Sequence, residues 1–476
     1  MADREELFFK KKNAYDTISE DDRARASAYA GEYKRFLDRS KTEREAVREA
    51  VSLAEGMGFM RYEPDMELAP GTKIYATVAG KTVFLAVIGK RPISEGVNIA
   101  AAHVDSPRLD LKQSPLYEEE GLAFFKTHYY GGIKKYQWVT LPLALHGVVV
   151  RKDGSRIDVV IGEDERDPVF MITDLLPHLG KEQEKKTLGE AFTGENLNIL
   201  LGSRPDGEEK ETDRVKLSAL RILNERYGLI EEDFLSAELE AVPAGRARDL
   251  GFDDSMIAAY GHDDRSCAFA ALRAILDARE PERTAVCVLT DKEEIGSEGM
   301  TGMQSAAFED FMSYICGGMG GVGRTFARSF CISADVCNAF DPCFPDVSEK
   351  NNSAFINRGM AVMKYTGARG KSGSNDASAE TVGFLRRLFD ANAVAWQTTE
   401  LGKVDQGGGG TVAMYMANRN IETIDAGVPV LSMHAPFEIV SKLDCYMVYK
   451  GIRALYESET PDGASGGRGE KDGGTH

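Results

Sequence analysis

The sequence has 476 residues, 42% hydrophobic and 28% charged, a composition typical of a folded globular protein too long for one small domain. Its 58 basic and 76 acidic side chains give a net charge of −18, which argues against nucleic acid as a partner because that binding needs a concentrated basic surface. No apolar run approaches the ~20 residues that span a bilayer, and the charged start MADREELFFKKK does not resemble a signal peptide.

The first predicted elements are helices within residues 13–58, where EREAVREAVSLAEGMG carries apolar side chains at helical spacing before a glycine stop. Buried strands come next within 73–104, in KIYATVAG, KTVFLAVIGK and GVNIAAAHVD. Residues 113–250 differ in character, because strand-like pieces such as HGVVVRKDGSRIDVVIG stand among polar, charged stretches. We therefore interpret 113–250 as an insertion into a larger domain.

After residue 251 the pattern alternates between buried strands and amphipathic helices. The expected strands are 284–291, 329–336 and 427–435, and the expected helices are 266–280, 378–393, 411–419 and 438–458. Such alternation predicts an α/β fold with a mixed, mostly parallel sheet covered by helices. Residues 1–112 and 251–460 would form this discontinuous domain, and the Gly-rich tail 461–476 is predicted to be disordered.

Ligands of open α/β sheets bind beyond the carboxyl ends of the strands, so polar residues just after the predicted core segments are candidates for a site. Five segments lead to acidic or imidazole side chains, which are His103 and Asp105, Asp263 and Asp264, Glu293 and Glu294, Asp335, and His434. Each alone has an ordinary explanation, such as a structural histidine, a helix cap or a charged turn. Together they indicate a metal site, and mixed imidazole and carboxylate ligands suit zinc, cobalt or manganese. A set so rich in carboxylates also suits two metals bridged by an aspartate.

The same residues carry a resemblance to a known family. AAHVDSPRLDLK, GHDDRSCAFAAL, DKEEIGSEG, SADVCNAFDP and LSMHAPFE resemble, in order and spacing, the five signatures of the M18 metalloaminopeptidases, relatives of aspartyl aminopeptidase. The resemblance extends over residues 70–456. It implies an α/β zinc-aminopeptidase core with an inserted, β-rich dimerisation domain at 113–250.

The resemblance also implies a role for each candidate residue. His103 and Asp335 would bind one divalent ion, Glu294 and His434 would bind a second, and Asp263 would bridge the two. Zn²⁺ is the expected metal, with Co²⁺ or Mn²⁺ as alternatives. Asp105 would orient His103 by a hydrogen bond, and Glu293 would be the general base. The implied reaction is removal of N-terminal residues from peptides by metal-activated water.

Two further segments bear on specificity and assembly. Relatives that prefer acidic N-terminal residues use a lysine in the segment matching MKYTGARGKSGSNDASAE, so Lys364 is the first candidate for a substrate contact and Lys371 the second. For Lys371 a solvated surface lysine is an equal alternative. YYGGIKKYQW (129–138) matches a loop that reaches the neighbouring subunit's active site in this family, but Lys134 and Lys135 occupy it here, so no single residue is assigned that role.

The expected partners are peptides and further copies of the chain. Family members assemble as tetrahedral dodecamers of dimers, and the seven cysteines without a CxxC pair are typical of a reducing cytoplasm. We expect neither nucleic acid nor membrane as partners. The alternatives left open are a carboxypeptidase or N-deacylase on the same core, or a non-catalytic scaffold of the same fold.

Overall fold

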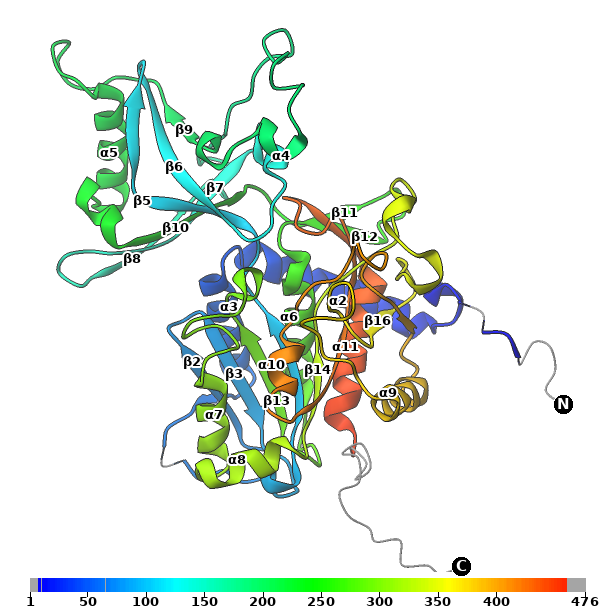
Figure 1. Cartoon of the computed structure of the whole chain (residues 1–476). Coiled ribbons are helices and arrows are strands. Elements are labelled where there is room, and N and C mark those ends of the chain that lie inside the picture. The colour runs from blue at the N-terminus through cyan, green and yellow to red at the C-terminus, as the bar shows by residue number, and fades with distance from the viewer. Residues whose placement is uncertain (1–6, 10, 65, 460–476) are drawn as a thin grey trace, which may run out of the picture.

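The computed structural model describes residues 7–9, 11–64 and 66–459, so the predicted tail 461–476 lies outside it. In the described part of the chain, the largest sheet has nine strands, with helices on both faces (Figure 1). Their spatial order is β1 (Met60–Arg61), β2 (Lys73–Val78), β3 (Thr82–Val87), β13 (Ala285–Thr290), β4 (Asn98–His103), β14 (Phe330–Ser333), β18 (Glu422–Gly427), β16 (Met360–Met363) and β17 (Trp396–Thr398).

This sheet is mixed and mostly parallel, which confirms the predicted fold class. Parallel pairing joins β1 to β2, β13 to β4, β4 to β14, β14 to β18, and β16 to β17. Strands β4 and β13 are buried along their whole length, as expected of strands covered on both faces.

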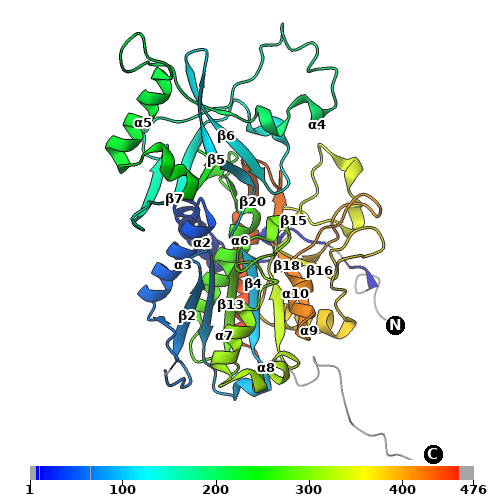
Figure 2. The same ribbon diagram turned by 60° about the vertical axis from the view of Figure 1, so that its left-hand side comes forward.

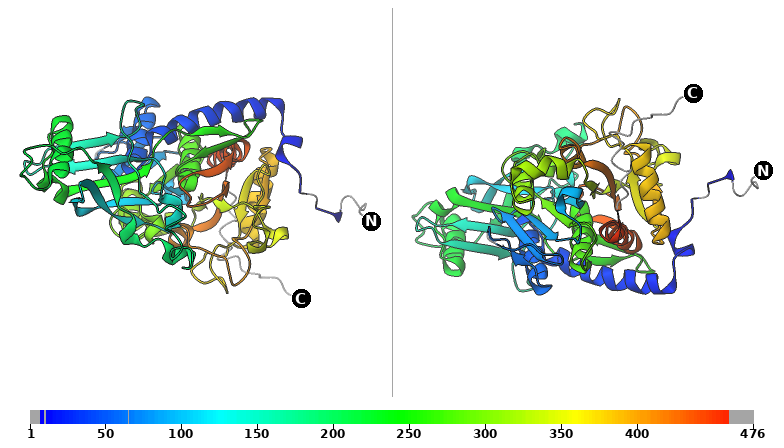
Figure 3. Two further views of the ribbon diagram at one scale, coloured as in Figure 1. Left: turned by 90° about the horizontal axis from the view of Figure 1, so that it is seen from above. Right: turned by 90° about the horizontal axis from the view of Figure 1, so that it is seen from below.

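Alternation along β4 divides the core into two layers, because successive side chains of a strand point to opposite faces. Ala100 and Ala102 pack with one set of helices, and Ile99 and Ala101 pack with the other. The first set is α2 (Glu20–Arg39), α3 (Glu43–Gly56), α6 (His262–Asp277), α9 (Ala379–Ala391) and α11 (Lys442–Glu457), and the second is α7 (Ala307–Ile315), α8 (Met319–Phe326) and α10 (Ala413–Ala417). Figure 3 shows the long helix α2 along one side of the molecule.

A second, six-stranded sheet is antiparallel throughout its described strands and comes from the segment between β4 and β12. Its order is β8 (Arg156–Ile161), β7 (Leu143–Val150), β10 (Ala237–Pro243), β5 (Arg108–Glu119), β6 (Leu122–Tyr130) and β9 (Ile199–Gly202), accompanied by α4 (Leu188–Ala191) and α5 (Arg214–Tyr227). It has its own apolar cluster. Because β4 leads at His103 directly into β5, the carboxyl end of β4 faces this second sheet, while α8 lies at the opposite end of the molecule (Figures 1 and 2).

A third, five-stranded sheet differs from the elements expected after residue 427. Its order is β11 (Arg248–Leu250), β12 (Met256–Ala259), β20 (Glu438–Ser441), β19 (Pro429–Leu431) and β15 (Cys337–Asn338). The helix expected over 438–458 was wrong in its first four residues, which form β20, because Ile439 and Val440 pair with Ala258 and Ile257. Helix α11 begins only after Ser441, whose hydroxyl accepts hydrogen bonds from the first turn.

Short 3₁₀ turns connect these elements. They are η1 (Ala14–Asp16), η2 (Ile93–Glu95), η3 (Lys135–Trp138), η4 (Gly194–Asn196), η5 (Glu231–Ser236), η6 (Glu293–Ile295), η7 (Pro345–Val347) and η8 (Lys350–Asn352). Among the described residues, no helix is both long and apolar enough to cross a membrane. The division into a catalytic and an inserted domain stays a prediction.

Candidate metal centre

Parallel register brings the carboxyl ends of β4, β13 and β14, which lead to predicted site residues, to one end of the nine-stranded sheet. His103, the last residue of β4, pairs with Thr290, the last residue of β13. Asp335 comes two residues after the end of β14, which pairs with β4 on its other side. Asp263 lies in the first turn of α6, and His434 lies between β19 and β20. Four separate core segments therefore deliver their polar side chains to the same place.

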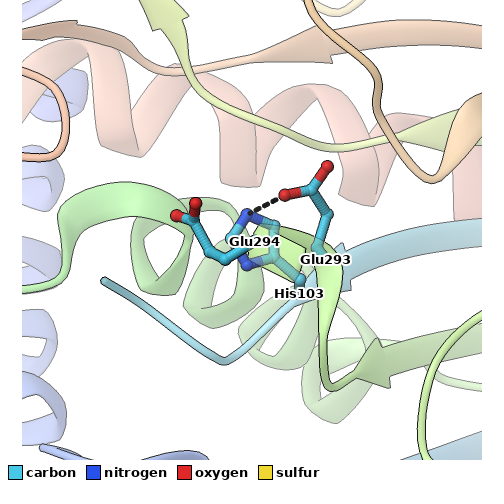
Figure 4. Close-up of side chains that lie close together, drawn as sticks. All are labelled: His103, Glu293 and Glu294. Atoms are coloured by element: carbon cyan, nitrogen blue, oxygen red, sulfur yellow. Dashed lines mark ion pairs between the residues drawn. The ribbon is translucent and has the colours of Figure 1, made fainter. Parts of the chain in front are cut away.

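The adjacent pair Glu293 and Glu294 reaches this edge through a tight turn. Lys292 has a positive φ of 67°, and the chain then enters the 3₁₀ turn η6. A 3₁₀ turn does not send neighbouring side chains to opposite faces as a strand would, so both carboxylates can approach one site. Figure 4 shows them on either side of the His103 imidazole, and Glu293 Oε2 lies 3.9 Å from His103 Nε2.

Asp263 is the centre of the arrangement. Its Oδ1 lies 3.2 Å from His103 Nε2, and its Oδ2 lies 3.2 Å from His434 Nε2. Two groups with potential ligand atoms within 4.8 Å of one another share this residue, namely His103, Asp263 and Asp335, and Asp263, Glu294 and His434. A third group joins His103 with Glu293 and Glu294. Asp264, the neighbouring candidate, belongs to none of these groups although its carboxylate is fully buried.

Asp105 does not face the ligand atoms but holds the residues that do. Its Oδ1 lies 3.2 Å from His103 Nδ1 and accepts a hydrogen bond from the backbone N–H of Glu293 at 3.1 Å. Its Oδ2 accepts from the N–H of Glu294 at 3.2 Å and from the Tyr130 hydroxyl at 2.8 Å. Burial raises the pKa of Asp105, but hydrogen bonds from His103 and Tyr130 outweigh it and keep the pKa below its usual value. Asp105 is therefore an ionised anchor.

Two supporting groups were missed by the sequence-based prediction. Glu438 is buried and accepts hydrogen bonds from the backbone N–H groups of Asp263 at 2.9 Å and His434 at 2.7 Å. The carbonyl oxygen of Gly132 accepts from His434 Nδ1 at 2.8 Å, which leaves Nε2 directed at Asp263. Glu438 is the last residue of the motif LSMHAPFE, so an acidic residue at the end of that motif was the available signal. A backbone carbonyl leaves no such signal.

The electrostatics of this cluster fit bound cations. Burial raises the pKa of Glu293 to about 8, against the lowering effect of His103, and burial together with Asp263 raises that of Glu294. Glu294 Oε1 is buried without a hydrogen-bond partner among the described residues. Burial lowers the pKa of His434, but its hydrogen bond with Asp263 and the charge of Glu294 raise it to about 10. Crowded, buried carboxylates with a free acceptor atom and two inward imidazoles are the donor set that zinc takes.

The ion pairs described for the two candidate substrate lysines do not include this donor set. Lys364 and Lys371 both form ion pairs with Asp376, the second at 3.0 Å. Their side chains are 46% and 42% exposed, whereas the His103 side chain is 1% exposed. Lys371 also lies 3.8 Å above the Tyr365 ring. The role of the two lysines in substrate binding stays a prediction.

Carboxylates and imidazoles that converge at the strand ends of a mixed α/β sheet are typical of a metal-dependent protein. Comparison with known proteins gives the family. The family model described as "Aminopeptidase I zinc metalloprotease (M18)" matches residues 36–456. A curated relative, "Probable M18 family aminopeptidase 1" of Clostridium acetobutylicum, is 50% identical over an alignment of 462 residues that covers 94% of this chain and 99% of that protein.

Solved structures agree. The crystal structure of an M18-family aminopeptidase from Thermotoga maritima has 42% identity and a TM-score of 0.90, over 94% of this chain and 100% of the other. The dodecameric mApe1 of S. cerevisiae has 21% identity and a TM-score of 0.71, over 90% and 98%, and shows the shared fold. The chain belongs to the M18 family, and it is a metallo-aminopeptidase, as the motifs predicted.

Proposed function

We propose that this aminopeptidase works with two divalent ions, one held by His103 and Asp335 and the other by Glu294 and His434, with Asp263 between them. The observation that carries the proposal is that the two oxygens of Asp263 each face a different imidazole at 3.2 Å. A carboxylate placed in this way could be shared by two ions. When bound, the ions would activate a water molecule for attack and polarise the scissile carbonyl.

The chain's own residues would move the proton. Glu293 is the candidate general base. Its carboxylate forms a group with that of Glu294 and with the imidazole of His103, and the turn that carries it is fixed by the hydrogen bond from its backbone N–H to Asp105. It would take a proton from the attacking water at one carboxylate oxygen and deliver it to the leaving amine. Bound cations would lower its pKa from about 8, so that the carboxylate is ionised at neutral pH.

The same charge distribution favours a free N-terminus. The centre gathers several carboxylates around two imidazoles, so a protonated or metal-ligating α-amine is attracted where a blocked amine is not. The His434 side chain is 34% exposed, which supports an open side of the centre at the proposed second metal position. A preference for acidic N-terminal residues would need a cation near the substrate side chain, and Lys364 remains the first candidate, followed by Lys371.

The experiment that tests this proposal combines metal content with two matched variants. We expect the purified protein to bind two Zn²⁺, Co²⁺ or Mn²⁺ ions per chain and to hydrolyse aminoacyl-p-nitroanilides but not their N-acetyl forms or N-acyl amino acids. Glu293→Gln should retain both ions and lose about 10²–10⁴-fold in kcat, while Glu298→Gln, at an exposed carboxylate just after the same turn, should leave kcat unchanged. One ion per chain at saturation, or near-normal turnover by Glu293→Gln, would contradict the proposal.

Assembly and location are further parts of the proposal. The yeast relative's dodecamer and the family resemblance support a homo-oligomer of dimers with tetrahedral symmetry. The inserted segment 113–250, which carries most of the second sheet, would supply the dimer contacts. The cysteines support a cytoplasmic location, since those at 267, 287, 331, 337 and 445 are free and buried. Light scattering of the purified protein measures the oligomer size directly.

A further inference from the structure

We propose that the second sheet takes part in the metal centre, and that Tyr130 and Arg108 are the positioning residues through which it does so. The inference rests on the proposed function for what the centre does. Tyr130 is the last residue of β6, and its hydroxyl donates a 2.8 Å hydrogen bond to Asp105 Oδ2. Through its two oxygens the same carboxylate also contacts His103 and the backbone of Glu293 and Glu294.

Arg108 fixes the ring that carries this hydroxyl. It pairs with Tyr130 in the β5–β6 register, and its guanidinium carbon lies 3.8 Å from the ring centroid. The guanidinium is in turn held by three carboxylates, with distances of 2.8 Å to Asp110, 3.1 Å to Glu240 and 3.5 Å to Glu43. Two of these acids belong to the second sheet and Glu43 belongs to α3, so the arginine is held by both parts of the molecule.

The residues just after Tyr130 reach the other half of the centre. Gly131 has a φ of 73°, and a side chain there would stand 3.4 Å from Glu294 Oε2. Gly132 lies close enough to His434 that a Cβ would be 3.3 Å from Nδ1, and its carbonyl oxygen accepts the imidazole hydrogen bond. The end of β6 therefore supports Asp105 on one side and His434 on the other. Supporting both proposed metal positions at once is a role for the second sheet beyond contact between subunits.

Loss of the Tyr130 hydroxyl tests the inference. Without it, Asp105 keeps its other partners but is less fixed, and a group that orients a metal ligand typically changes metal affinity by about 10–100-fold. For Tyr130→Phe we expect Zn²⁺ affinity of the metal-free protein, measured by competition with a chromophoric chelator, to fall about tenfold. We expect kcat to fall by a similar factor with KM within twofold, because Tyr130 acts on the centre through Asp105.

Tyr227→Phe is the matched control. Tyr227 lies on α5 in the same part of the chain, and its hydroxyl donates to the carbonyl oxygen of Val160 at 2.8 Å, away from the centre. The Tyr227→Phe variant loses the same atom and a hydrogen bond of the same length as Tyr130→Phe. Because that bond does not involve the centre, the variant should leave Zn²⁺ affinity and kcat unchanged. If Tyr130→Phe binds Zn²⁺ within twofold of the wild type, or if Tyr227→Phe weakens binding equally, the inference is wrong.

A double-mutant cycle tests whether Arg108 acts through Tyr130. Arg108→Lys keeps the charge beside the three carboxylates and loses the flat stacking group. We expect it to lower Zn²⁺ affinity several-fold in the wild type and to have little further effect in the Tyr130→Phe background, since interacting residues are non-additive. Additive losses would overturn the role given to Arg108. The Zn²⁺ titration does not depend on turnover, so a protein that binds metal but cleaves no peptide would refute the proposed function and leave this inference standing.

Discussion

Two buried polar clusters of this protein both contain imidazoles among carboxylates, yet they are built differently. In the metal centre, His103 Nε2 and His434 Nε2 point inward at the same aspartate, and the ligand atoms converge within 4.8 Å. In the second cluster, His146 is held between Glu45 at 2.9 Å and Glu163 at 3.1 Å, one on each ring nitrogen. Here the carboxylates diverge around one ring.

The difference lies in how each cluster balances its charge. His146 belongs to β7 of the second sheet and Glu45 to α3, so their contact joins the two parts of the molecule. Lys41 and Arg48 lie 3.8 Å from Glu163 and Glu45, and these cations complete the balance. In the metal centre, the described ion pairs include no lysine or arginine beside the ligand set, only the two histidines. Carboxylates that converge on one point with no lysine or arginine beside them indicate a metal site. Carboxylates that surround one imidazole and are balanced by cationic side chains indicate a structural contact between the two parts of the molecule.

Removal of the metals should have the largest effect on thermal stability, and it should act through the metal centre alone. Ions that bind only the folded protein stabilise it by about 4 kcal/mol when the free metal is a thousand times the Kd. We expect a chelator to lower the thermal midpoint of the wild type strongly and zinc to restore it. If the midpoint does not change although activity is lost, the centre does not couple metal binding to folding.

Glu294→Gln should separate affinity from stability. Zn²⁺ affinity should fall by about 100-fold or more, since even groups that only orient ligands cost 10–100-fold. The metal-free variant should unfold at a temperature no lower than the wild type, because burial and Asp263 already disfavour the ionised form of Glu294, and the substitution replaces that carboxyl group with a neutral amide. Calorimetry in chelator measures this, and a lower midpoint for the variant would show that Glu294 stabilises the fold by itself.

His146→Gln should affect stability in a pH-dependent way. Burial lowers the pKa of His146, but hydrogen bonds with Glu163 and Glu45 outweigh it and raise the pKa above 6.5. A raised pKa means that the stabilisation is complete below pH 6.5 and is lost as the pH rises through the folded-state value. We expect a cost of about 2 kcal/mol at pH 6, and a gap in thermal midpoint from the wild type that narrows toward pH 9.

The exposed His128 on β6 provides the control for that experiment. His128→Gln should change the midpoint little at any pH, because its side chain is exposed. A gap between His146→Gln and the wild type that stays constant from pH 6 to pH 9 would mean that the contact between the two parts of the molecule is held by packing rather than by charge. Neither variant should change Zn²⁺ affinity, which is the sharpest contrast with the metal centre.

The smallest effect is expected at the exposed lysines. Lys364→Gln should change stability by less than about 1 kcal/mol, because its ion pair with Asp376 is exposed to solvent. If Lys364 contacts an acidic substrate side chain, kcat/KM for N-terminal Asp or Glu should fall about tenfold, with Leu substrates unaffected. Lys371→Gln is the parallel variant. Equal losses on all substrates would remove acidic preference from the proposal.

Much of this centre could be predicted from the sequence because its residues lie at the ends of buried strands. His103, Glu293 and Asp335 come directly after apolar runs whose carboxyl ends must meet in a parallel sheet. Tyr130 could not be found in this way, since nothing local to β6 indicates that its hydroxyl meets a carboxylate 25 residues earlier in the chain. The carbonyl of Gly132 has no residue-type signal at all.

In the fold, too, elements set by their local sequence could be predicted, and elements set by pairing with distant segments could not. Five adjacent strands of the nine-stranded sheet, β2, β3, β13, β4 and β14, could be predicted from runs such as AVCVLT, which are buried on both faces. Strand β20 was mistaken for the start of a helix because EIVS precedes a strong helical pattern, and only its pairing with β12 makes it a strand. The third sheet therefore depended on partners that lie far apart in the chain, such as Ile257 and Val440.

The position of Glu438 has a consequence for synthesis. This residue clamps the backbone of both Asp263 and His434, yet it comes after every proposed metal ligand in the chain. The chain is synthesised from its N-terminus, so a nascent chain that already contains His103, Asp263 and Asp335 still lacks His434 and Glu438. Zinc retention by ribosome-stalled chains should therefore begin only once the β19–β20 segment has emerged. The enzyme would be unable to cleave its neighbours on the polysome before its own last strand is in place.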